Sequence, residues 1–287
     1  SACMIPPKSI PAPMIDEITT QTKALAIELA VKGLINIQFA VKNNVLYVLE
    51  VNPRASRTVP FVSKAKGVPL AKIAVKVMLG HKLSEFGLKD RFTTPYMCVK
   101  EAVLPFNKFQ GSDIILGPEM RSTGEVMGIA RDFGEAFYKA TLAAGDILPR
   151  EGKIFASFTD ETKKAVMADM KLLVENGFTL VGTEGTSRSL SENGIPCDKV
   201  YKVSEGRPNI VDMVKNGEIC MILNTPTGKG SRADQNAIRQ AAIRYHLPLV
   251  TTPSAIHAAV EGIIRMKKDN TVTVRSIQEY HGEMKKG

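Results

Sequence analysis

Residues 153–186 read KIFASFTDETKKAVMADMKLLVENGFTLVGTEGT, and this stretch decides the fold class of the second half of the chain. A short apolar run, 154–158, precedes a segment with helical character, 162–175, and a second β-rich run follows at 179–181. Strand, helix and strand in this order predict two parallel strands joined by a right-handed helical crossover.

The same alternation continues along the rest of the chain. Further strands are expected at 199–203, 219–223 and 248–250. Helices are expected at 187–192, 210–215, 233–245 and 254–266. Short β-rich runs that alternate with helices predict an α/β domain, with a doubly wound parallel sheet and helices over both faces.

The first half has a different pattern, typical of an α+β arrangement. A helix is expected at 15–32, with Gly33 as its C-cap, and a β-hairpin at 34–41 and 45–51. The remaining elements expected there are a helix at 68–79, a strand within 96–106, a looped segment at 116–128 and a helix at 132–142. The stretch GDILPREG, 145–152, marks the expected boundary between a domain 1–144 and a domain 145–287.

Composition narrows the class of ligand. The 287 residues carry a formal net charge of +9, spread along the chain, which suits anionic ligands. The chain has no Trp, and its Phe and Tyr residues number 11 and 6, so aromatic side chains that stack on bases are scarce and nucleic acid is the weaker option. The four cysteines have no CxxC spacing, no apolar run approaches the ~18 residues of a membrane span, and no signal peptide is recognisable. We therefore expect a cytoplasmic protein with reduced thiols and no membrane partner.

A first set of polar residues surrounds EVNPRASRTVPF, 50–61. Glu50 and Asn52 are two apart on a strand, so both point to one face, and Gln38 lies on the preceding strand. Carboxylate and amide oxygens suit magnesium, and Arg54 and Arg57 follow where their planar forks could hold phosphate. Together they indicate phosphoryl transfer. By spacing alone, an edge strand followed by an Asn-Pro turn with solvated arginines explains the residues equally well.

The hairpin register tests this interpretation. A plain two-residue turn at Asn43-Asn44 would place Gln38 opposite Leu49, facing away from Glu50. We therefore predict a longer loop or a β-bulge that brings Gln38 onto the face of Glu50.

A second set of polar residues stands at the ends of successive strands in the second half. Open α/β sheets bind ligands beyond the carboxyl ends of their strands, so these residues converge on one place. Hydroxyls, glycines at helix starts and two lysines suit a phosphate group, although Thr, Asn and Gly also commonly cap helices and form turns. The set is Ser157, Lys163, Thr183, Thr186, Lys202, Asn224 and Thr225.

Three long motifs resemble the large chain of carbamoyl phosphate synthetase. They are QFAVKNNVLYVLEVNPRASRTVPFVSKAKGVPLAKIA (38–74), VKEAVLPFNKF (99–109) and LGPEMRSTGEVMG (116–128). The resemblance extends over essentially the whole chain, and it points to the end of the second ATP-grasp synthetase half.

The resemblance implies roles for the first set of residues. Positions matching Gln38, Glu50 and Asn52 bind Mg²⁺ or Mn²⁺ in the family, and those matching Arg54 and Arg57 contact the phosphoryl group. It implies an ATP-dependent carbon-nitrogen ligase that makes carbamoyl phosphate from bicarbonate, glutamine-derived ammonia and two ATP, in pyrimidine and arginine biosynthesis. This half phosphorylates carbamate. The glycine-rich loop and adenine pocket of an ATP-grasp domain are missing from the sequence, which also begins SACMIPP without Met. We expect a fragment that is inactive alone.

The residues from about Gly145 onward resemble the allosteric domain of that family, which shares the fold of methylglyoxal synthase. Positions matching the second set form a pocket for nucleotide effectors such as UMP and IMP. Pro226 departs from the pattern, because a Thr occurs there in enterobacterial versions. Positions matching Glu101, Leu104 and Thr251 help to bind ornithine, but Val250 replaces an expected acid, which weakens that expectation.

The resemblance also implies partners: the glutaminase small subunit, the rest of the large chain, and an oligomer of that heterodimer. Two other functions stay open. One is a stand-alone module that binds a nucleotide effector. The other is a lyase like methylglyoxal synthase, against which stands the lack of a GDQ-type loop in this sequence.

Overall fold

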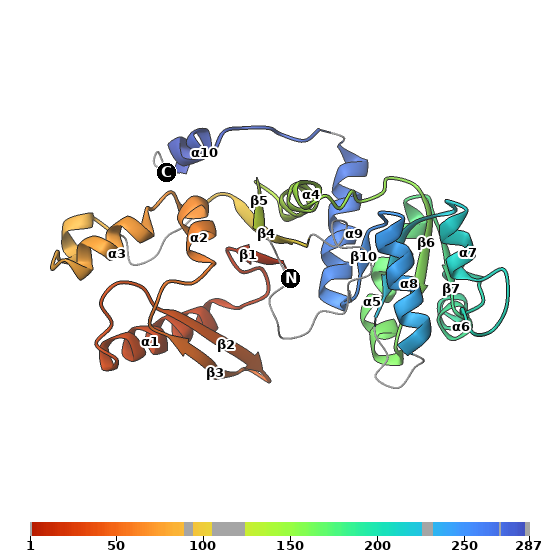
Figure 1. Ribbon diagram of the computed structural model, residues 1–287, viewed down its shortest axis with the longest axis horizontal. Coiled ribbons are helices and arrows are strands. Elements are labelled where there is room, and N and C mark those ends of the chain that lie inside the picture. The colour runs from red at the N-terminus through yellow and green to blue at the C-terminus, as the bar shows by residue number, and fades with distance from the viewer. Residues whose placement is uncertain (1, 89–93, 105–123, 226–231, 270, 285–287) are drawn as a thin grey trace. The chain divides into compact units, whose positions relative to one another are not determined.

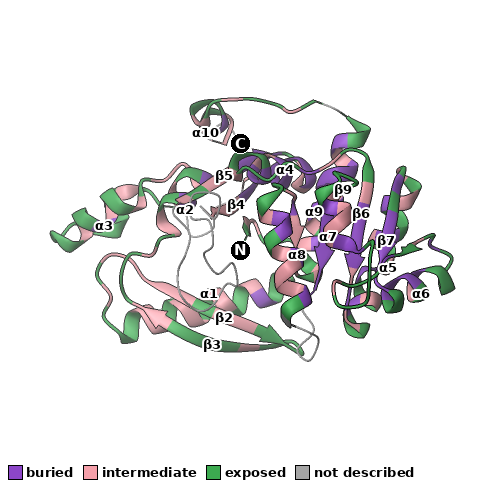
Figure 2. Cartoon of the chain, turned by 45° about the vertical axis from the view of Figure 1, so that its right-hand side comes forward, coloured by how far each residue is buried: buried purple, intermediate pink, exposed green. Residues whose placement is uncertain are grey.

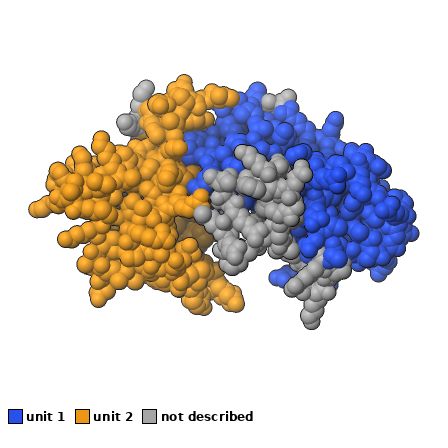
Figure 3. All heavy atoms as spheres, viewed as in Figure 1, with its two compact units in different colours: residues 1–3, 98–273 blue, residues 4–97, 274–287 orange. Residues whose placement is uncertain are grey.

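The computed structural model describes residues 2–88, 94–104, 124–225, 232–269 and 271–284 (Figure 1). The chain divides into two compact units, coloured separately in Figure 3. Unit 1 comprises residues 1–3 and 98–273, and unit 2 comprises residues 4–97 and 274–287. Within the described residues, no helix combines the length and apolar character that a membrane span requires.

Unit 1 contains the predicted parallel sheet. Its elements in chain order are β4 (Met97–Val103, whose first residue belongs to unit 2), β5 (Gly124–Ala130), α4 (Phe133–Ala144), β6 (Gly152–Ser157), α5 (Asp160–Glu175), β7 (Phe178–Gly182), α6 (Glu184–Glu192), β8 (Asp198–Lys199), α7 (Ile210–Lys215), β9 (Ile219–Asn224), α8 (Arg232–Arg244), β10 (Leu249–Val250) and α9 (Pro253–Lys268).

Five strands of the described residues form one sheet in the order β10-β9-β6-β7-β8, and every neighbouring pair is parallel. The chain first adds strands on one side of β6 and then on the other, which is the doubly wound arrangement. The predicted α/β class is thereby confirmed. The strand expected at 199–203 is shorter, since β8 ends at Lys199. The chain turns shortly after it, where the backbone N–H of Glu205 donates to the Lys202 carbonyl at 3.1 Å.

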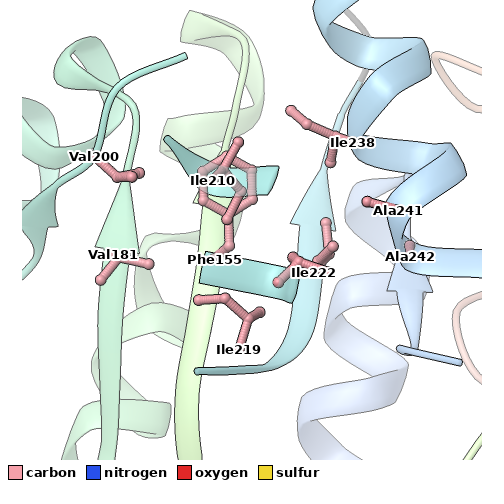
Figure 4. Packing of buried hydrophobic residues seen from close by; sticks show 10 residues of the cluster. Phe155, Val181, Val200, Ile210, Ile219, Ile222, Ile238, Ala241 and Ala242 are labelled. Carbon is pink, nitrogen blue, oxygen red and sulfur yellow. The ribbon is translucent and has the colours of Figure 1, made fainter. Parts of the chain in front are cut away.

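The core of unit 1 lies on both faces of this sheet. Phe155 of β6 and Ile222 of β9 point to the face that α7 and α8 cover, where Ile210 and Ile238 meet them (Figure 4). Neighbouring residues along a strand point to opposite faces, so Ile154 faces the layer formed by α5 and α9. Both faces are buried, as Figure 2 shows by the purple strands β6, β7 and β9. This explains why these strands have continuous apolar runs instead of alternating ones.

Residues 98–144 belong to unit 1, although the sequence placed them in the first of two domains. Helix α4 packs against α9, and at Gly134 an added Cβ would lie only 2.9 Å from the Glu261 carbonyl oxygen. Arg265 Nε of α9 also donates to Asp132 Oδ2, just before α4, at 3.1 Å. The compact units thus divide elsewhere than at residue 145, and the predicted boundary between family domains stays a prediction.

The prediction of a looped segment at 116–128 is wrong for its last five residues, which form part of β5. Gly128 does not mark a loop there. An added Cβ would lie 2.0 Å from the Ala136 carbonyl oxygen, so the glycine lets β5 and α4 approach closely. The rest of that segment, 116–123, lies outside the described residues.

Unit 2 contains the predicted hairpin with helices around it. Its elements are β1 (Cys3–Ile5, whose first residue belongs to unit 1), α1 (Ala12–Glu28), β2 (Asn36–Lys42), β3 (Val45–Asn52), α2 (Val59–Lys66), α3 (Leu70–Met78), a 3₁₀ turn η1 (Leu83–Phe86) and α10 (Ile277–Met284).

Three features of unit 2 differ from the expectations. Helix α1 ends at Glu28, because Ala30 has a positive φ of 47° that an α-helix does not accommodate. Helix α2 was not expected, and Gly67, with φ of 65°, separates it from α3. The C-terminal helix α10 was also not expected. Its Tyr280 packs edge-to-face on Tyr96, with ring centroids 4.9 Å apart.

Candidate functional site

A cavity of about 490 Å³ lies in unit 1 at the carboxyl ends of β6, β7 and β9. All seven residues of the second predicted set line it, so the structure brings them together as the strand-end argument required. The sequence missed six further lining residues. The full lining is Ser157, Phe158, Lys163, Thr183, Gly185, Thr186, Lys202, Ser204, Asn224, Thr225, Asp234, Gln235 and Ile238.

The hydroxyl groups of the cavity are held by the backbone of the neighbouring strand end. The N–H of Phe158 donates to Thr186 Oγ1 at 3.0 Å, and the N–H of Thr159 donates to Thr225 Oγ1 at 3.3 Å. A threonine oxygen that accepts from the backbone keeps its own proton for another acceptor. These contacts therefore fix two hydroxyls whose protons a bound anion can accept.

Three helices with lining residues, α5, α6 and α8, start at this cavity, and the first turns of α5 and α6 differ in capping. In α5 the Thr159 hydroxyl accepts from the Thr162 N–H at 3.2 Å, whereas Thr183, the first residue before α6, makes no such side-chain cap. Instead the Thr183 hydroxyl lies 3.4 Å from that of Ser157. The backbone N–H groups of Thr186 and Ser187 donate to the Thr183 carbonyl, so the start of α6 offers the cavity the positive end of its dipole and the backbone N–H of Gly185, which lines the cavity.

Two lysines give the cavity its positive charge. Lys163 Nζ lies near the start of α6, because a Cβ added at Gly185 would be 3.5 Å from it. Lys163 contacts Asp160 Oδ1 at 2.7 Å, and Lys202 contacts Glu205 Oε1 at 3.0 Å. Hydrogen bonding from Lys163 lowers the pKa of Asp160, and hydrogen bonds from the Lys202 backbone and then its side chain lower the pKa of Glu205. Both carboxyl groups are therefore ionised at neutral pH.

Two buried polar groups complete the site. Asn224 is 2% exposed, and its Nδ2 is among the buried atoms without a hydrogen-bond partner in the described residues. Such a group carries a desolvation cost of about 1–3 kcal/mol unless a ligand or water satisfies it. Asp234 is buried at the first turn of α8, and its Oδ2 accepts from the Ser204 hydroxyl at 2.7 Å.

The residues missed by the sequence had a weak signal. Asp234 and Gln235 stand at the start of a predicted helix, where an acidic residue is ordinarily read as stabilising the helix dipole. Phe158 and Gly185 are neighbours of predicted residues in the chain. Pro226, a predicted departure, lies outside the described residues.

The first predicted set lies in unit 2, on the β2–β3 hairpin. Gln38 pairs directly with Glu50, and Phe39 pairs with Val48, so Leu49 is the extra residue of a bulge. The predicted bulge is confirmed, and residues directly opposite each other share a face. Asn52 lies on the same face and its Nδ2 donates to Glu50 Oε1 at 2.8 Å.

The arginines of this set lie in the loop between β3 and α2, and both are exposed. Arg54 Nη1 donates to the Ala55 carbonyl at 2.9 Å. Gln38 and Glu50 are also exposed. One carboxylate with two amide oxygens fits a hard divalent cation that takes its other ligands from water or phosphate. In the described part of the chain, no three His, Cys, Asp or Glu side chains gather where a metal ion could bind.

The residues that the resemblance assigns to ornithine binding lie on separate elements. Glu101 and Leu104 lie at the end of β4, and Thr251 follows β10. Burial raises the pKa of the Glu101 carboxyl. Among the described residues, no hydrogen bond or ion pair joins Thr251 to Glu101, so the structure shows three positions and not a common site.

Comparisons with known proteins agree with both halves. Residues 2–86 match the family described as carbamoyl-phosphate synthase L chain, ATP binding domain, and residues 166–251 match the MGS-like domain. Two solved structures show distant likeness. A biotin carboxylase domain of a single-chain bacterial carboxylase has TM-score 0.41 and 17% identity, and covers 50% of this chain and 40% of its own. Methylglyoxal synthase from Elizabethkingia anophelis NUHP1 has TM-score 0.32 and 14% identity, with 40% of this chain and 79% of its own covered.

Curated relatives are much closer. A carbamoyl phosphate synthase large chain of Methanosarcina barkeri is 50% identical over 284 residues, which are 99% of this chain and 71% of that one. The large chain of Archaeoglobus fulgidus is 51% identical over 99% of this chain, but only 26% of its own length is covered, and that of Rhodopirellula baltica is 50% identical with the same coverage. The chain thus spans about a quarter of these longer relatives. With half of its residues shared along almost its whole length, the chain belongs to the carbamoyl phosphate synthase large chain family.

Proposed function

We propose that this chain is the part of a carbamoyl phosphate synthase large chain that carries a nucleotide effector pocket and one wall of the carbamate-phosphorylating site. The observation that carries the first part is the cavity in unit 1, which all seven predicted effector residues line. The ligand we propose is a nucleoside monophosphate of the UMP or IMP type.

The cavity has a separate partner for each part of such a ligand. The phosphate would accept hydrogen bonds from Thr183, Thr186 and the start of α6, with Lys163 and Lys202 supplying charge. Asn224 Nδ2 would find in the phosphate the acceptor that the described protein atoms do not provide. Asp234 would accept from a ribose hydroxyl, and Ile238, on the same helix, would contact the base.

Titration calorimetry of the chain with UMP and with IMP tests this pocket. We expect saturable binding of one or both, and a loss of about 10- to 100-fold in affinity for Lys163→Met, because a hydrogen bond to a charged group is removed. Lys171→Met on the same helix α5, with an exposed side chain, is the matched control. Wild-type protein that binds neither nucleotide, or two variants with equal affinity, would contradict the pocket.

The second part of the proposal concerns the exposed face of the hairpin. Gln38, Glu50 and Asn52 would hold Mg²⁺ or Mn²⁺, which when bound neutralises charge on the ATP phosphates. Arg54 and Arg57 would orient the transferred phosphoryl group with their planar donors. The shared face of Gln38 and Glu50 supports this assignment.

Electron paramagnetic resonance of Mn²⁺ in the presence of ATP tests the metal site. Glu50→Gln is expected to weaken Mn²⁺ binding about tenfold or more, since it removes the carboxylate of the set, while Glu28→Gln, an exposed residue of α1, leaves binding unchanged. Equal binding by the two variants would remove Glu50 from the site.

We also propose the whole reaction, on the basis of family membership. It is an ATP-dependent carbon-nitrogen ligation that yields carbamoyl phosphate from bicarbonate and glutamine-derived ammonia, with the glutaminase small subunit and the rest of the large chain as cytoplasmic partners, for pyrimidine and arginine biosynthesis. We propose that this chain supplies only part of the phosphorylating site and that the rest of the large chain supplies the remainder. ATP turnover by this chain alone would contradict that proposal. Ornithine is the least supported ligand, because Val250 offers no charge to its ammonium group and Thr251 is not joined to Glu101 in the described contacts.

A further inference from the structure

Both lysines of the cavity are already partnered by a carboxylate three positions away. Lys163 has a side chain that is 13% exposed, and its partner Asp160, at 2.7 Å, is 98% exposed. Lys202 and Glu205, at 3.0 Å, are 48% and 37% exposed. The cavity is lined by the lysines and not by these two acids, which therefore stand at its rim.

The two carboxylates are held where they are by more than the lysine side chains. Asp160 is the first residue of α5, where the helix dipole favours a negative charge. Glu205 accepts from the backbone N–H of Lys202 at 3.0 Å through its other oxygen. Neither acid moves away without losing a second favourable interaction, so an incoming anion has to share each lysine with its carboxylate.

In the described part of the site, acidic side chains outnumber the lysines. Among the described residues, Lys163 and Lys202 are the cations that line the cavity, and each is paired with a carboxylate at the rim. The buried carboxyl group of Asp234, which accepts from Ser204, lines the cavity as well. A single phosphate can still bind, because hydroxyls, an amide and helix N–H groups supply neutral donors. Each further phosphate would bring negative charge toward the rim, where the acids stand and where, among the described residues, no cation besides the two lysines lines the cavity.

We propose that Asp160 and Glu205 are specificity-determining residues, which moderate the positive charge of Lys163 and Lys202 and so restrict the pocket to ligands with one phosphate group. The inference rests on the proposed effector pocket and adds the two residues that limit the number of phosphate groups it accepts. It predicts discrimination between UMP and UTP, which share a nucleoside and differ in phosphate number.

The experiment compares UMP and UTP affinities of the whole chain by calorimetry in wild type, Asp160→Asn, Glu205→Gln and the double variant. Releasing a lysine from an ion pair is expected to raise UMP affinity about two- to five-fold per variant, and UTP affinity by a larger factor. Glu161→Gln removes an equal charge from the same first turn of α5 and is the matched control, expected to leave the UTP-to-UMP affinity ratio unchanged. Asp160→Glu, which retains the charge, should retain the preference for UMP.

The outcomes separate this inference from the proposed pocket. Wild-type protein that binds neither UMP nor UTP overturns the inference, and it overturns the proposed pocket as well when IMP also fails to bind. Wild-type binding of UMP with the same UTP-to-UMP ratio in Asp160→Asn, Glu205→Gln and Glu161→Gln overturns the inference alone. Circular dichroism of each variant checks its fold, and the double variant, with both lysines released, should show the largest change in the ratio.

Discussion

At the scale of single residues, burial determines which side chains are available for chemistry. Burial raises the pKa of the thiols of Cys98, Cys197 and Cys220 to about 11, so these groups are poor nucleophiles at neutral pH. Lys163 has the opposite situation, because its ammonium group reaches the cavity while its side chain is mostly covered. Burial thus lowers the reactivity of the three thiols, whereas at Lys163 it leaves the ammonium group at the cavity.

The thiols provide a direct test. At pH 8 a thiol with a pKa of about 11 is ionised to only about one part in a thousand, so iodoacetamide is expected to modify the exposed Cys3 first. The three other cysteines should react after unfolding in urea. Intact mass spectrometry at intervals gives the order, and labelling of Cys98 as fast as Cys3 would contradict the burial described here.

Asp169 of α5 gives a pH-dependent prediction. Its Oδ2 lies 2.5 Å from His257 Nδ1 of α9, yet burial raises its pKa, with the histidine partly offsetting this. A carboxyl whose folded pKa exceeds its unfolded value of about 3.9 stabilises the fold fully below that value, and this contribution is lost as pH rises through the folded pKa. Asp169→Asn should therefore gain stability relative to wild type between about pH 4 and pH 7.

Urea unfolding at the two pH values measures this difference. Asp198→Asn, an exposed aspartate of β8, is the control and should show a smaller pH-dependent change. A stability difference for Asp169→Asn that is equal at both pH values would show that the carboxyl is not destabilised by burial.

At the scale of elements, the ends of helices decide how the chain connects sheet and cavity. Asn209 begins α7 and caps it in full, because its Oδ1 accepts from the N–H groups of Val211 and Asp212 and the Asp212 carboxylate accepts from the Asn209 N–H. Thr183 before α6 does not cap in this way. The start of α6 lies beside the cavity and lacks the side-chain cap that α5 and α7 have, so its donors can serve a ligand instead.

Replacing Asn209 tests how much the N-cap of α7 contributes to the stability of the fold. Asn209→Ala is expected to lower the free energy of unfolding by about 1–2 kcal/mol, because two backbone N–H groups lose their acceptor at a buried position. Asn216→Ala, at the exposed other end of the same helix, should change stability by less than about 0.5 kcal/mol. Chemical unfolding monitored by circular dichroism measures both, and equal effects would contradict the capping argument.

At the scale of the whole molecule, the chain groups its elements into units that differ from their order in sequence. Helix α4, which precedes the parallel sheet, is part of unit 1, and α10, which follows it, is part of unit 2. In unit 2, Tyr280 of α10 packs on Tyr96, and His281 Nε2 lies 2.6 Å from the Lys64 carbonyl of α2. Membership of a unit is therefore decided by contacts between residues that are far apart in the chain.

The α4–α9 contact can be tested through one glycine. Gly134→Ala would place a methyl group 2.9 Å from the Glu261 carbonyl and from Arg265 Cβ, so it should destabilise the pair by about 1–3 kcal/mol. Helix propensity alone predicts the opposite sign, a gain of up to about 1 kcal/mol. Gly282→Ala in α10, with open space around it, is the control that shows the propensity effect. Hydrogen exchange of the amides in α4 and α9 reads out the first change, and slower exchange in Gly134→Ala would contradict the close packing.

The sequence by itself determined the parallel sheet, the hairpin and seven of the residues that line the cavity. Apolar periodicity records which face of a local element is buried, and strand ends such as Ser157 and Asn224 meet wherever parallel strands end together. The bulge at Leu49 was also predictable, because Gln38 and Glu50 share a face only with one extra residue between them.

Only the tertiary structure decided the remaining features. These are the membership of α4 in unit 1, the position of α10, the presence of Asp234 in the lining of the cavity, and the pairing of Lys163 and Lys202 with carboxylates. Each depends on distances between groups on different elements or on side-chain positions within one turn. Periodicity says whether a residue is buried, but it does not say against which partner, and these partners set the charge of the cavity.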